Sequence, residues 1–128
     1  MELQIPVAPG ELIDKLTILE IKLENITDPE KLANVRREYK LLTAVWKNAG
    51  RETDEVTGLR SELHAVNRRL WDIEDAIREC ERKNDFGERF VALARSVYLE
   101  NDQRAEIKKR INLELGSDIV EEKSYAEY

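Results

Sequence analysis

Apolar residues recur at alternating intervals of three and four along most of the chain, which is the spacing of one face of an α-helix. Four such runs cover residues 11–26, 29–49, 53–82 and 85–115. The third is the longest and keeps heptad spacing throughout, at Val56, Leu59, Leu63, Val66, Leu70, Ile73, Ile77 and Cys80. Short connections between helices favour antiparallel neighbours. The pattern predicts an all-α fold, an antiparallel helical bundle of about four helices.

Turn-forming residues separate these runs. Asp28 and Pro29 are typical of an N-cap followed by the first helical position. Gly50 suits the left-handed position that ends many helices. Asp85 stands three positions before a glutamate, the spacing of a capping box, so we expect the fourth helix to begin there. The first eight residues alternate weakly and contain Pro6, which indicates a short extended N-terminal arm.

Composition narrows the class of protein. A length of 128 residues fits a single domain over residues 1–128, and 38% charged residues with 6% aromatics favour long helices over sheets. The net charge of −6 argues against nucleic-acid binding. We expect no membrane association and a cytoplasmic location, because no signal peptide and no long apolar stretch is present. The single cysteine, Cys80, excludes an internal disulfide.

The fourth predicted helix changes character along its apolar face. Its apolar residues are followed on the same face by a polar run, Asn101, Arg104, Lys108 and Asn112. Antiparallel pairing brings this run toward polar residues of the first and third helices, Glu11, Asp14, Arg60, Glu62 and Asn67. Buried charges need partners, so we expect an interhelical ion-pair network that fixes register. The alternative is a ligand pocket, in which Arg104 and Lys108 bind an anion beside Glu11, Asp14 and Asn101.

Three apolar residues lie off the predicted stripes. Ile18 and Ile21 point away from the stripe of the first helix, so this helix is either central, or covered by the arm, or part of a subunit interface. Trp71 lies off the seam of the third helix, where Arg68, Arg78 or the C-terminal tail covers it, or a partner does. These positions indicate a homo-oligomer or another protein partner, with Ile18, Ile21 and Trp71 as contact residues.

Motifs that carry enzyme chemistry are largely absent. The sequence has no glycine-rich phosphate loop, dinucleotide fingerprint, HExxH or CxxC, and no nucleophile elbow accompanies the only histidine, His64. Carboxylates at helical spacing, as in magnesium-dependent helical pyrophosphohydrolases, occur at Glu11, Asp14, Asp72, Glu74, Asp75 and Glu79. The last four lie mostly on the solvated side of the heptad pattern. The opening ELIDKL suggests a chorismate-mutase-like helix only weakly. We expect no metal and no cofactor, and favour a binding module over an enzyme.

Several long segments resemble a small bacterial family of unknown function. They are GELIDKLTILEIKLENI, AVNRRLWDIEDAIRECE and NDFGERFVALARSVYLENDQRAEIKKRINLELGSDIVEEKSY, and the resemblance covers about residues 5–125. It implies a short, soluble, predominantly helical protein and assigns no activity, cofactor or catalytic residue. The family-like segments include Asp14, Lys15, Trp71, Asp72, Arg95, Tyr98, Asn101, Asp102 and Arg104. The sequence thus indicates a helical protein-interaction or scaffolding module; the alternative is a small helical enzyme or binder of an anionic ligand.

Overall fold

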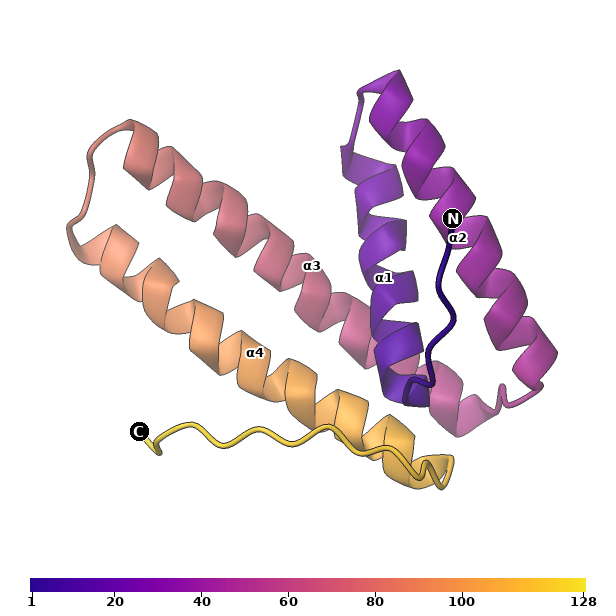
Figure 1. Cartoon of the computed structure of the whole chain (residues 1–128). Helices are drawn as coiled ribbons and strands as arrows, with labels where there is room; N and C mark the ends of the chain where they lie inside the picture. The colour runs from indigo at the N-terminus through magenta and orange to yellow at the C-terminus, as the bar shows by residue number, and fades with distance from the viewer.

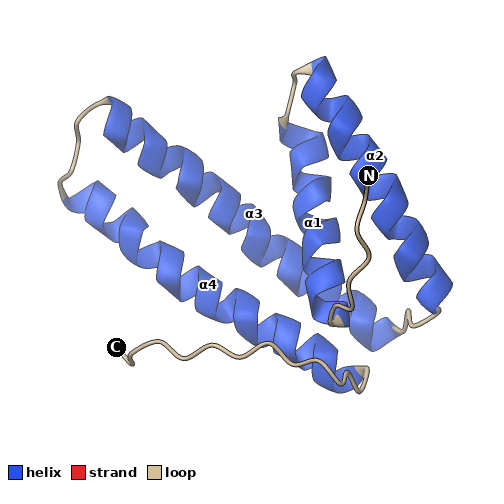
Figure 2. Cartoon of the chain, in the orientation of Figure 1, coloured by secondary structure: helices blue, strands red, loops and turns tan.

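The computed structural model describes all 128 residues and contains four helices and no strand (Figure 2). The helices are α1 (Pro9–Asn25), α2 (Pro29–Ala49), α3 (Asp54–Arg82) and α4 (Glu88–Glu114). The prediction of an all-α antiparallel bundle with an extended N-terminal arm is therefore confirmed. None of the helices combines the length and apolar composition needed to cross a lipid bilayer.

The helices form two antiparallel hairpins that cross near one end (Figure 1). α1 packs against each of the other three helices, whereas α2 packs against α1 alone. The core lies at the crossing and takes residues from all four helices: Leu12, Ile13, Leu16, Trp46, Val56, Leu59, Leu63, Val66, Ile107 and Ile111. Beyond the crossing, α3 and α4 continue as a two-helix arm, and the C-terminal tail runs back along α4 (Figure 1).

The helix ends follow local rules, with one correction. Asp28 caps α2 by accepting hydrogen bonds from two backbone N–H groups at 2.9 and 3.3 Å, and Gly50 ends it with a φ of 64°. α4 begins at Glu88, so the prediction of a start at Asp85 is wrong. The Asp85 carboxylate instead accepts a hydrogen bond from the N–H of Gly87 at 3.2 Å. Such a turn between a side chain and the backbone competes with helix formation, so the first helical turn begins three residues later in the sequence.

α1 is buried on more than one side. Leu16 lies in the core, but Ile21 on the other side is also buried, with 1% of its surface exposed. Ile21 is therefore covered within the chain, and Ile18 is half-buried. A helix that packs against three neighbours needs apolar residues around most of its circumference. The alternative interpretation, in which the first helix is central, describes the structure.

The start of α1 approaches α4 at a glycine. The backbone N–H of Gly10 donates a hydrogen bond to Oδ1 of Asn112 at 2.7 Å. A Cβ atom at position 10 would lie 2.5 Å from the carbonyl oxygen of Lys108 and 2.8 Å from Oδ1 of Asn112. Because both distances are below van der Waals contact, a glycine is required for the two helices to meet this closely.

Candidate functional site

The polar run of α4 meets α1 through a buried carboxylate. Arg104 donates from Nε to Oδ1 of Asp14 at 2.9 Å and from Nη2 to Oδ2 at 2.5 Å. Asp14 is 1% exposed, and the hydrogen bond to it raises the pKa of Arg104 above its usual range. A two-point contact of this kind fixes distance and orientation together. It joins the two helices at one defined register.

Lys108 forms the second ion pair of this contact. Its Nζ donates to Glu11 and to Glu121 of the tail, each at 2.8 Å. Burial lowers the pKa of Lys108, but the hydrogen bonds to these two carboxylates raise it by more, so the net shift is upward. The side chain is 11% exposed. Both cations that the sequence predicted for this face are therefore paired within the chain.

Asn67 ties α3 to the same carboxylate. Its Nδ2 donates to Oδ1 of Asp14 and to Oγ1 of Thr17, each at 2.9 Å. The Thr17 hydroxyl donates in turn to the carbonyl oxygen of Asp14 at 2.8 Å. The predicted meeting of Asp14 with Asn67 is thus found. Thr17 was missed, although its place one helical turn after Asp14 was a usable signal.

Two predicted members of the network lie elsewhere. Arg60 pairs at 2.6 Å with Glu20, which lies one helical turn beyond Thr17 on α1. Glu20 also accepts a hydrogen bond from the hydroxyl of Tyr39 at 3.1 Å. Burial is the main cause that raises the pKa of Tyr39, and Glu20 adds to it. Glu62 faces Arg110 at 3.6 Å on the exposed side. The α1 to α3 contact therefore has a second polar centre, which sequence reasoning missed.

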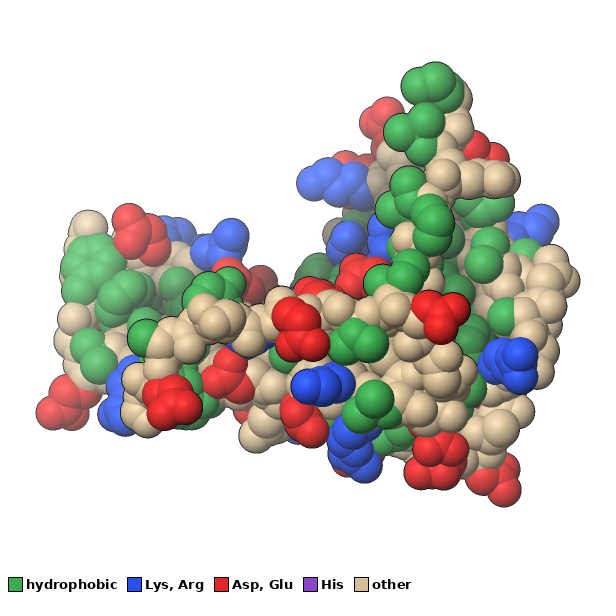
Figure 3. Space-filling model, turned by 60° about the horizontal axis from the view of Figure 1, so that its bottom comes forward, with side chains coloured by type: hydrophobic (Ala, Val, Ile, Leu, Met, Phe, Trp, Pro, Cys, Tyr) green, Lys and Arg blue, Asp and Glu red, His purple; other side chains and the backbone are tan.

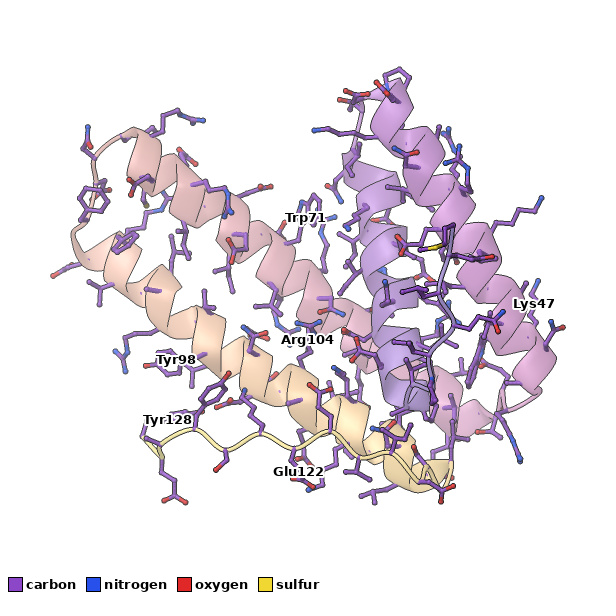
Figure 4. The ribbon with its side chains drawn as sticks, in the orientation of Figure 1. Lys47, Trp71, Tyr98, Arg104, Glu122 and Tyr128 are labelled. Carbon is purple, nitrogen blue, oxygen red and sulfur yellow. The ribbon has the colours of Figure 1, made fainter.

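An open groove runs along α4 beneath the C-terminal tail (Figure 4). Asp102 accepts hydrogen bonds from Nζ of Lys123 and from the hydroxyl of Tyr128, each at 2.5 Å. The ring of Tyr128 lies 5.2 Å from that of Tyr98, centroid to centroid. Asn101 lines the groove with Arg104, Lys108 and the tail residues. The periodicity of the chain predicted nothing about the position of this tail.

Trp71 faces the open space between the hairpins (Figure 4). Its ring is half-buried. No arginine guanidinium lies over the ring, since the one cation–π contact of the chain joins Lys123 to Tyr125. Arg68 and Arg78 pair with carboxylates instead. The tail is also not its cover, since it follows the far side of α4 (Figure 4). Of the three apolar residues predicted off the stripes, Ile21 is buried, whereas Ile18 and Trp71 are half-buried.

The carboxylates considered for magnesium do not gather into a metal site. No group of three or more His, Cys, Asp or Glu side chains is placed to hold a metal ion. The Asp14 carboxylate is already engaged by Arg104 and Asn67. Of the acidic group on α3, Asp72 pairs with Arg68 and Glu79 pairs with Lys83.

Fold and site together define an all-α protein of two crossed helical hairpins joined by a buried ion-pair network. The chain belongs to the family of unknown function DUF6165, whose sequence model matches residues 1–128. The resemblance to an uncharacterised family is thereby confirmed. No curated protein and no solved structure matches the chain.

Proposed function

We propose that this protein is a cytoplasmic interaction module that self-associates through the face of α3 bearing Trp71. One observation carries the proposal: from Trp71 to Glu106 only Cys80 is buried. The apolar seam of this two-helix arm is half-buried at Leu70, Ile73, Ile77, Phe90, Leu93 and Val97. Two helices alone cannot cover their own apolar faces, and stable folds add a second layer. A second copy of the chain supplies that layer.

The face of α3 that bears Trp71 continues a face that already contacts a helix. Arg60 and Arg68 of α3 pair with Glu20 and Glu24 of α1. The same stripe continues beyond the end of α1 at intervals of four, three and four, as Trp71, Asp75, Arg78 and Arg82. Figure 3 shows the surface hollowed between the free end of the α3/α4 hairpin and the α1/α2 hairpin. The stripe is thus a helix-binding face without a helix against it.

Charge makes this stripe complementary to itself. In a two-fold antiparallel contact, Asp75 of one copy lies opposite Arg78 of the other, and Trp71 lies opposite Arg82. Asp75 forms no ion pair within the chain and is free to pair with Arg78 of the other copy, which in its own chain pairs with the exposed Glu74. Arg82 also forms no ion pair and is free to stack on the Trp71 ring. Tryptophan and arginine are also the side chains that contribute most to protein interfaces. A second copy therefore fits this face better than an unrelated helix.

Charge exchange tests the contact. Asp75→Arg places two arginines opposite each other in both symmetric contacts, and Arg78→Asp places two aspartates there. Each variant alone should weaken dimerisation, measured by light scattering or sedimentation, at least about tenfold, or about 1.4 kcal/mol. An equal mixture of the two variants restores opposite charges at both contacts, so it should dimerise like the wild type.

The matched control is Glu62→Arg, the same change in charge on the opposite flank of α3, where the side chain is exposed. It should leave the dimer unchanged. A wild-type protein that stays monomeric at high concentration would overturn the proposal. So would a mixture of the two variants that stays as monomeric as either one alone, because the geometry requires them to be complementary.

A further inference from the structure

The C-terminal tail is held on α4 by a few side-chain contacts. Residues 118–128 are exposed throughout, and Tyr128 retains 81% of its surface. The tail leaves the helix at Gly116, whose φ of 61° is left-handed. Its anchors are Glu121 on Lys108 and Lys123 on Asp102. Lys108 is buried, but Glu121 is exposed and the Lys123–Asp102 pair is partly exposed, so the tail side of each contact is open to water and holds weakly. Another chain with the same groups can therefore displace this segment.

The surface beneath the tail is matched to an extended peptide. Lys108 and Asp102 are six residues apart on α4, a rise of about 9 Å. Glu121 and Lys123 are two residues apart, about 7 Å in an extended chain, and point to the same side. The two charges of the helix and the two charges of the peptide therefore have similar spacing. Because the tail runs back along α4, Glu121 meets Lys108 and Lys123 meets Asp102. Tyr98 adds an aromatic surface one turn farther on, against Tyr128.

The groove has cationic capacity that the tail does not use. Arg104 donates hydrogen bonds to Asp14 from Nε and Nη2, while its Nη1 makes no hydrogen bond in the chain. Its side chain is 30% exposed and lines the groove. Lys109 lines the same groove and forms no ion pair within the chain. The tail thus leaves Nη1 of Arg104 and the Lys109 ammonium group without a carboxylate, in a groove that Glu106 also lines. A peptide that places a carboxylate at these two donors gains contacts that the tail lacks.

We propose that the groove of α4 is a binding site for an extended acidic peptide of a partner protein, and that the tail is its internal competitor. The ligand carries a carboxylate for Lys108 and, two residues later, a cation for Asp102. Its further acidic groups reach Arg104 and Lys109. This site lies on the opposite side of α4 from Trp71 (Figure 4), so it is independent of the self-association face.

A labelled peptide of residues 117–128, SDIVEEKSYAEY, serves as the probe in fluorescence anisotropy with the full chain. A tail-release variant, Glu121→Gln with Lys123→Gln and Tyr128→Ala, loses the anchors of its own tail and leaves the α4 residues of the groove unchanged. It should bind the probe at least tenfold more tightly than the wild type. Adding Asp102→Asn to this variant should reverse the gain, and circular dichroism should show the same helix content in all three proteins.

The control peptide exchanges two residues of the probe, so that lysine stands at position 121 and glutamate at 123. It has the same charge and composition in the wrong order, and it should bind at least fivefold more weakly. Equal binding of both peptides, or equal binding of the probe by wild type and release variant, would overturn the proposal. Displacement of the probe by millimolar glutarate would also overturn it, in favour of a small-anion site. Wild-type dimers that dissociate in the release variant would overturn it as well, in favour of tail exchange between copies of this chain.

Discussion

Asp14 and Arg104, ninety positions apart, form a two-point ion pair that joins α1 to α4 inside the structure. The carboxylate has almost no contact with solvent, and Asn67 of α3 donates to it as well. Apolar side chains tolerate several ways of packing, whereas a buried carboxylate tolerates only the one that pairs it. The ion pair therefore selects the register in which α1, α3 and α4 assemble.

Arg104→Ala should lower the free energy of unfolding by about 3–5 kcal/mol, because it leaves the buried Asp14 carboxylate without its cation. Urea denaturation followed by circular dichroism measures the change. The control is Arg78→Ala, which removes an arginine from an exposed pair with Glu74 and should cost less than about 1 kcal/mol. Similar losses in the two variants would contradict the structural role of the buried pair.

Gly10→Ala should destabilise the fold by about 1–3 kcal/mol, since the added methyl group overpacks the contact with the α4 backbone. Gly58→Ala is the matched control. Position 58 lies within α3 with no atom near the added Cβ, so alanine should stabilise the protein by about 0.4–1 kcal/mol. Thermal or urea unfolding distinguishes the two, and a loss at position 58 would show that the helix is not continuous there.

The tail should detach in acid. Hydrogen bonds from Lys123 and then Tyr128 hold the pKa of Asp102 below its ordinary value of 3.8. A lowered folded-state pKa means that the contact is fully present above pH 3.8 and is lost as the pH falls through the lowered value. NMR signals of the Tyr128 ring should therefore move to their free-peptide positions below pH 3.8. In Asp102→Asn they should stay near those positions at every pH; an unchanged acid transition would assign it to another group.

The two tryptophans should differ in their contribution to stability. Trp46 is buried in the core and donates from Nε1 to Glu52 at 2.8 Å, so Trp46→Ala should cost about 3–5 kcal/mol. Trp71 is half-buried beside open space, and Trp71→Ala should cost much less in a dilute, monomeric sample. Urea denaturation at low protein concentration provides the comparison. A loss at Trp71 as large as that at Trp46 would mean that its ring belongs to the core of the single chain.

The sequence by itself determined the four helices and the polar contact at their centre. Helical periodicity and local capping depend on residues three or four apart, which explains why Asp28 and Gly50 were placed correctly. The polar run of α4 was also found, because antiparallel pairing of adjacent helices brings Arg104 to the same level as Asp14. The start of α4 was placed too early, at Asp85. An aspartate carboxylate can accept a hydrogen bond either in a turn or as a helix cap, and here it does so in a turn.

Only the tertiary structure decided how the hairpins cross and what each helix face meets. Periodicity shows which face of a helix is apolar, but the crossing angle follows from how side chains of two helices interdigitate. Ile21 is buried because α1 lies among three helices, and Trp71 borders open space because α1 ends before reaching it. The tail lies on α4 through contacts between single side chains far apart in the sequence. Such contacts leave no periodic pattern in the sequence, so the position of the tail cannot be predicted from the spacing of residues.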